Sequence, residues 1–193
     1  SVSAVNTVNT DGTMTVGGSL TTGTVDNQQN ATLELDGGTV TGNVNNTGEV
    51  TGNGTIDGVL TNDGTVRVDA GDTLTSTSQV KNNDTVELDG TLAAGLLNNK
   101  DGTVTMNGGT VSGAVDNRGE LTGTGTITGA LTNSGEADLG GTLSGVENSG
   151  TLGTNGDLSV ASLNNTGTVI LDTGDPLSST APVDNGKTLN VSG

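Results

Sequence analysis

The 193-residue chain contains no cysteine, no histidine and no aromatic residue. Without cysteine it can form neither a disulfide nor a thiolate metal site, and without histidine it lacks the commonest general base and metal ligand. Without aromatic side chains it has no platform on which nucleic acid bases could stack. It also has no run of about 18 apolar residues, the length that crosses a bilayer. We therefore expect no metal, no cofactor and no membrane insertion by this segment.

Positive charge is also scarce, because 5 Lys and Arg stand against 22 Asp and Glu, for a net charge of −17. A surface of this sign repels phosphate backbones and anionic membranes, so we expect no nucleic acid partner. A polar chain without aromatics is also compatible with a disordered spacer. The regular placement of the aliphatic residues argues against a spacer, since disorder requires no such spacing.

One short pattern, an aliphatic residue followed two positions later by Asn, occurs eleven times along the chain. The aliphatic residues, spaced 15 to 20 positions apart, are Val8, Val25, Val44, Leu60, Val80, Leu97, Val115, Leu131, Val146, Leu163 and Val183. Thr10 replaces the Asn in the first copy, and the other ten are Asn27, Asn46, Asn62, Asn82, Asn99, Asn117, Asn133, Asn148, Asn165 and Asn185. A repeat this short is typical of stacked coils.

The stretch from Val44 to Leu60 illustrates one coil. Val50 and Ile56 lie in short β-prone segments that Gly-containing turns separate, and with Leu60 they mark three strands. Because strand faces alternate, Gly58 shares the inward face of Leu60. Small residues recur at this position, and we expect them to line a narrow corner where two walls approach closely.

The sequence thus predicts an all-β fold: a single-stranded parallel β-helix (β-solenoid) of about eleven triangular coils of roughly 17–18 residues. We expect residues 1–193 to form one β-solenoid domain. On the second strand of each coil, the predicted stack places Leu74 beneath Ile56 and Leu158 beneath Leu143. Residues 31–68 also match residues 102–139 at an offset of 71 positions, which indicates duplication of a four-coil block.

Stacking places each Asn of the repeat directly above the next one. An amide can donate to one neighbour and accept from the other, so we predict a structural Asn ladder. A row of ligands for a cation or a sugar is the functional alternative, but a neutral amide column is a poor cation site.

One outward face is rich in hydroxyl groups. They belong to the residues directly before and after the inward residue of each second strand, such as Ile56. The candidate binding residues of this face are Ser19, Thr21, Thr39, Thr41, Thr55, Thr73, Thr75, Thr91, Thr110, Ser112, Thr126, Thr128, Thr142 and Ser144. Thr favours strands, so strand propensity alone can explain the pattern. The other two interpretations are a self-association face and an ice-binding face, because the grid resembles the Thr-x-Thr arrays of ice-binding β-helices. Asp57, Asp157 and Pro176 interrupt that grid.

Paired carboxylates are the remaining chemical candidates, and they are Asp69 with Asp72, Glu136 with Asp138, and Asp172 with Asp175. Two carboxylates can hydrolyse a glycoside when they are held at the right separation, so a polysaccharide-degrading β-helix is an alternative function. With no aromatic subsite for a sugar ring, the sequence favours solvated surface charges and predicts no catalytic residue.

The segments Asn46 to Ile56 (NTGEVTGNGTI) and Leu131 to Gly135 (LTNSG) resemble the passenger-domain repeats of bacterial autotransporter adhesins. Filamentous-haemagglutinin-type secreted β-helices are similar. This resemblance covers nearly the whole chain and implies a right-handed β-helix, part of a longer protein on a Gram-negative cell surface. It also implies adhesion, aggregation or biofilm formation. The implied partners are a host or neighbouring cell surface, or copies of the chain associated side by side or end to end.

Overall fold

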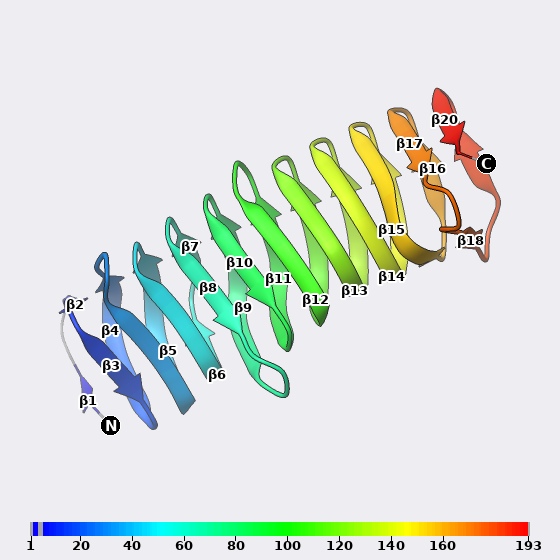
Figure 1. Cartoon of the computed structure of the whole chain (residues 1–193). Helices are drawn as coiled ribbons and strands as arrows, with labels where there is room; N and C mark the ends of the chain where they lie inside the picture. The colour runs from blue at the N-terminus through cyan, green and yellow to red at the C-terminus, as the bar shows by residue number, and fades with distance from the viewer. Residues whose placement is uncertain (1, 4–5, 193) are drawn as a thin grey trace.

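The computed structural model describes residues 2–3 and 6–192 of the chain. Its strands form one sheet of 20 strands in which every pairing is parallel, and this sheet winds into a β-solenoid of about eleven turns. The strands follow one another along a rod with the chain termini at opposite ends (Figure 1). The predicted fold class is confirmed, while the right-handed winding stays a prediction.

Each coil presents three walls, which residues 32–46 define. Residues 32–35 lie on the first wall, 39–41 on the second and 43–46 on the third, because each group pairs with a different segment of the preceding coil. The inner faces of the three walls bury the aliphatic residues of the repeat from Val25 to Leu163.

Many strands occupy a single wall. On the first wall these are β3 (Thr13–Val16), β8 (Thr65–Val68), β10 (Thr85–Leu88), β17 (Thr168–Leu171) and β20 (Thr188–Val191). On the second they are β1 (Val2–Ser3) and β18 (Leu177–Ser179), and on the third β2 (Thr7–Thr10), β7 (Leu60–Asn62), β16 (Leu163–Asn165) and β19 (Val183–Asn185).

Other strands continue around a corner. Two cover the first and second walls, namely β6 (Glu49–Asp57) and β15 (Thr151–Val160). Three cover the second and third walls, namely β4 (Ser19–Asn27), β9 (Thr73–Asn82) and β11 (Thr91–Asn99). Four cover all three walls, namely β5 (Thr32–Asn46), β12 (Thr103–Asn117), β13 (Glu120–Asn133) and β14 (Glu136–Asn148). The prediction of three separate strands per coil is therefore wrong for these coils.

The column of small residues before the third wall has a different cause from the one predicted. Gly42 and Gly113 have φ values of 143° and 149°, and a Cβ on either would collide with the backbone oxygen of Thr22 or Ala94 in the preceding coil. The close approach therefore runs along the rod axis between successive coils, and not between two walls. Another member of the column, Ser78, is exposed, so these residues do not line the interior.

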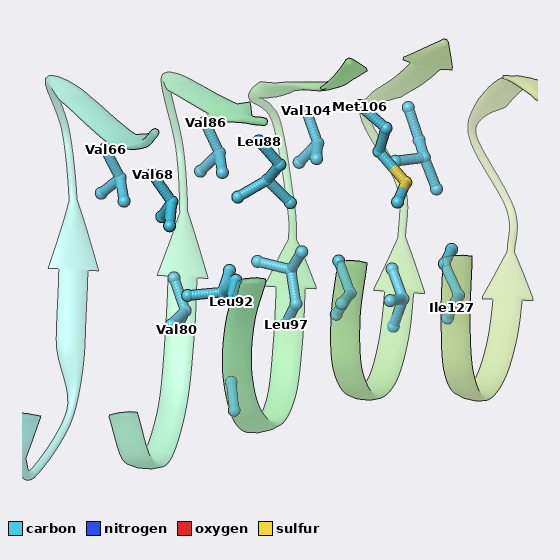
Figure 2. Close-up of a cluster of buried hydrophobic side chains, with 14 of the residues drawn as sticks. Val66, Val68, Val80, Val86, Leu88, Leu92, Leu97, Val104, Met106 and Ile127 are labelled. Carbon is cyan, nitrogen blue, oxygen red and sulfur yellow. The ribbon is translucent and has the colours of Figure 1, made fainter. Parts of the chain in front are cut away.

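The first wall supplies a second inward column that the sequence analysis missed. Val66, Val86 and Val104 stack as predicted, and Val68, Leu88 and Met106 stack beside them in Figure 2. All six side chains are buried.

In two coils this second column holds a glycine, Gly52 or Gly123, and the glycine two residues further on lies against the longer side chain of the preceding coil. Met106 lies against Gly125, since a Cβ on this glycine would lie 2.6 Å from the Met106 Cε. Leu35 lies against Gly54 in the same way, with 2.8 Å between its Cβ and the added Cβ. These two contacts lie 71 residues apart and occupy equivalent places in the duplicated blocks.

The predicted stacking on the second wall is wrong at two coils. Ile56 pairs with Ser76 and not with Leu74, and Leu143 pairs with Val160 and not with Leu158. In both cases extra residues at the preceding corner move the strand by two positions. A shift of two residues preserves which face is buried.

Apolar side chains of the last described coil are more exposed than predicted. Val183 is 42% exposed and Leu189 45%, whereas their counterparts one coil earlier, Leu163 and Val169, are buried. Val191 is 67% exposed, and its counterpart Leu171 is partly buried. The three exposed residues have a described coil on one side only.

Candidate functional site

The ten asparagines of the repeat form one continuous ladder of side-chain hydrogen bonds. In every rung the amide nitrogen donates to the side-chain oxygen of the Asn in the following coil, at 2.7–2.9 Å. The Thr10 hydroxyl begins the ladder by donating to Asn27 at 2.7 Å. All rungs point the same way along the rod.

Nine of the ten amides, all but Asn185, also tie the third wall to a first-wall strand further along the rod. The Asn27 nitrogen donates to the Glu49 backbone oxygen at 2.8 Å, and the Asn117 nitrogen donates to that of Glu136 at 2.8 Å. The ladder residues are buried except for Asn185 in the last described coil. Their polar atoms bond within the protein, so the buried part of the ladder cannot contact a partner.

The hydroxyl groups of the second wall form two unbroken columns, and both differ from the predicted alignment, in which Thr73 follows Thr55. One column consists of Ser19, Thr39, Thr55 and Thr75, paired in that order. The other consists of Thr73, Thr91, Thr110, Thr126, Thr142, Ser159 and Ser178. We call these together the hydroxyl columns. Their side chains are exposed or partly exposed.

The two register shifts change which residues interrupt the face. Because Thr142 pairs with Ser159, Asp157 falls outside the longer column, and so does Pro176. Asp57 remains on this wall, in a separate column that also contains Thr21 and Thr41. The hydroxyl columns themselves contain no charged residue.

The remaining predicted residues lie beside the hydroxyl columns. Ser112 follows Thr75 in register, but only after Ala93, which carries no hydroxyl. Thr128 and Ser144 are exposed at the edge of the same wall, where the Ser144 hydroxyl donates to the Thr128 backbone oxygen at 2.6 Å.

The first wall carries a further hydroxyl column that was not predicted from the sequence. Its threonines are Thr13, Thr32, Thr65, Thr85, Thr103, Thr151, Thr168 and Thr188, in register along the rod. Three glutamates, Glu49, Glu120 and Glu136, interrupt this column. The signal was present in the sequence, but the glutamates made the face look mixed.

Two of the three carboxylate pairs belong to tight turns. The Asp72 backbone nitrogen donates to the Asp69 backbone oxygen at 2.9 Å, and the equivalent bond from Asp175 to Asp172 is 3.1 Å. Gly71 has a φ of 91° and Gly174 a φ of 88°, as the third position of a type II turn requires. Turn geometry therefore accounts for the position of these four aspartates.

The candidate carboxylate Asp138 has a perturbed pKa. Partial burial raises the pKa of Asp138 above its ordinary value, and the charges of Asp172, Glu136 and Asp175 raise it further. The Asp138 carboxylate lies over Gly153, where a Cβ would be 2.8 Å from its Oδ1. The glycine leaves space for the carboxylate to lie across the next coil.

Comparison of the chain with models of known protein families, with curated proteins and with solved structures finds no match. The resemblance to autotransporter passenger repeats therefore rests on the residue pattern. Among the described residues, no cluster of three or more Asp, Glu, His or Cys side chains is arranged to hold a metal ion. The same residues include no helix long and apolar enough to cross a membrane.

Proposed function

We propose that this chain is a non-enzymatic extracellular rod that mediates adhesion or self-association through the hydroxyl columns of its second wall. The observation that carries the proposal is the uncharged, in-register column from Thr73 to Ser178 on a chain of net charge −17. Like charges repel, so contact with another acidic surface costs least where no carboxylate lies.

The geometry of this wall supports a role in surface contact. Parallel strands repeat about every 4.8 Å along the rod, so a hydroxyl recurs at that interval. Each hydroxyl can donate one hydrogen bond and accept others, and a regular row can pair with a second regular row. The wall is also wide enough for two columns side by side in the coil that holds both Thr73 and Thr75.

The resemblance to adhesin passenger repeats supports the extracellular location. The absence of cysteine from the sequence fits a rod that is stabilised by its ladder and not by disulfides. The partner on this account is a neighbouring cell surface or further copies of the chain.

Particles coated with the chain test the proposal. Coated microspheres should cluster, and the variant Thr91→Lys/Thr110→Lys/Thr126→Lys should disperse them, because three long charged side chains would break the hydroxyl column. The matched control is Thr65→Lys/Thr85→Lys/Thr103→Lys on the first wall, which adds the same charge and should leave clustering intact. Equal clustering by both variants would contradict the proposal.

The same seven-residue column favours ice binding as a second candidate. The register shift removes Asp157 and Pro176 from the column, so it is more regular than the sequence indicated. Thermal hysteresis and shaped ice crystals at micromolar protein would support this function. Their absence would exclude it while leaving the adhesive role in place.

A further inference from the structure

Four asparagines of this chain precede a glycine, and they are Asn53, Asn107, Asn155 and Asn185. In such a pair the backbone nitrogen of the glycine can attack the side-chain carbonyl of the asparagine, because glycine has no Cβ to obstruct the approach. The reaction needs an exposed amide and a glycine nitrogen that is free to move. The four sites differ in both respects.

The fold restrains three of the four pairs. The Gly186 nitrogen donates to the Asn165 backbone oxygen at 2.8 Å, and the Asn185 oxygen accepts the last rung of the ladder. The Gly156 nitrogen donates to the Asp175 carboxylate at 2.9 Å.

The pair at Asn53 is restrained by packing. Gly54 pairs with Leu74 of the following coil, and a Cβ placed on Gly54 would lie 2.6 Å from the Gly38 oxygen. Moving this glycine toward its neighbouring amide therefore disturbs the strand ladder.

Gly108 differs because it is an extra residue with no counterpart in either neighbouring coil. Seven positions separate Val104 from Val111, whereas six separate Val86 from Leu92 in the preceding coil. In the following coil, six positions likewise separate the residues that pair with Val104 and Val111. An inserted residue of this kind is a β-bulge, and the extra residue stays outside the ladder.

The surroundings of Gly108 are correspondingly open. In the pairing with the preceding coil, Met106 is the last paired residue before the bulge and Thr110 is the first after it. In the pairing with the following coil, these residues are Asn107 and Thr110. Gly108 has a φ of 88°, and a Cβ placed on it would meet no atom within 4 Å. Both Asn107 and Gly108 are exposed.

From these differences we infer that Asn107 is a spontaneous modification site, which the fold selects over the other three Asn–Gly pairs. The Gly108 nitrogen forms a bond to the Asn107 side-chain carbonyl carbon, and the bond from that carbon to the amide nitrogen breaks. Ammonia leaves with the proton from the Gly108 nitrogen. Water then opens the cyclic imide at one of its two carbonyls, which yields aspartate or isoaspartate. No oxidant or reductant takes part.

An aspartate, one of the two products, fits the position of Asn107. Asp36 and Gly37 occupy the equivalent place in the other duplicated block, 71 residues earlier. Gly37 has a φ of 72° and open surroundings like those of Gly108. An aspartate is therefore already accommodated at this corner, and conversion of Asn107 adds one negative charge between the first and second walls.

Peptide mapping by mass spectrometry tests the inference on the full chain in mildly alkaline buffer. The mass gain that marks conversion of an amide to a carboxyl group should accumulate at Asn107 several-fold faster than at Asn53, Asn155 or Asn185. In denaturant all four sites should react at similar rates, because the fold no longer distinguishes them.

Asn107→Gln is the control variant, since its longer side chain disfavours the five-membered ring. It should abolish the product in this peptide and leave the other three rates unchanged. Equal rates at all four sites of the folded chain, or a faster rate at one of the other three, would overturn the inference.

Discussion

The side-chain nitrogen of Asn82 donates to the side-chain oxygen of Asn99 across 2.9 Å, and both side chains are fully buried. This rung connects two coils through the interior, where no water competes for the bond. Removing one amide leaves a donor above and an acceptor below without partners, and each buried unpaired group is costly. The ladder therefore makes the stability of each coil depend on its neighbours.

The first prediction concerns a central rung. Asn117→Ala should lower the free energy of unfolding by about 2–4 kcal/mol, because it leaves the Asn99 nitrogen and the Asn133 oxygen without their rung partners. Denaturant unfolding followed by circular dichroism measures this loss. Asn164→Ala is the control on an exposed position of the third wall and should change stability by less than about 0.5 kcal/mol. Equal losses would show that the ladder has no special role.

A second prediction separates backbone strain from collision. Gly156→Ala places a side chain at a φ of 87° in open space, so it should cost about 1–2 kcal/mol from conformation alone. Gly113→Ala adds a collision with the Ala94 backbone oxygen and should cost clearly more. The denaturant midpoints of the two variants measure these losses of stability. A smaller loss for Gly113→Ala than for Gly156→Ala would contradict the close stacking of coils.

A third prediction concerns pH. The folded pKa of Asp138 lies above the ordinary value because of burial and the neighbouring acids. The folded state therefore binds this proton more tightly than the unfolded state, and stability falls as the pH rises through the raised pKa.

Asp138→Asn removes the charge and should raise the unfolding temperature at neutral pH. The advantage should vanish below the ordinary aspartate pKa of 3.8, where both proteins are uncharged at this position. Glu147→Gln on the exposed third wall serves as the control. An Asp138→Asn advantage that does not depend on pH would point to a cause other than ionisation.

The sequence predicted the coil, the Asn ladder and the third-wall stack, because the pattern from Val8 to Val183 repeats at nearly constant spacing. It could not predict the register of the second wall. The extra residues around Asp69 to Asp72 form a turn, and only the folded corner shows that the next strand shifts by two positions. The inward column of Val68 and Leu88 was missed because these strands extend one inward position beyond the predicted one.

The candidate site was predicted in composition but not in arrangement. Thr55 was expected above Thr73 and instead pairs with Thr75. Thr142 was expected above Asp157 and instead pairs with Ser159. Turn insertions of this kind change which hydroxyls are aligned. They preserve the alternation of inward and outward residues, so the sequence pattern on this wall looks the same for either alignment.

Sedimentation velocity over a range of protein concentrations tests the central claim most directly, namely that the hydroxyl columns of the second wall are the contact surface. The unchanged chain and the first-wall variant Thr65→Lys/Thr85→Lys/Thr103→Lys should both form species that grow with concentration. The second-wall variant Thr91→Lys/Thr110→Lys/Thr126→Lys should remain a monomer throughout. Identical sedimentation of the two variants, or a second-wall variant that associates as the unchanged chain does, would contradict the claim.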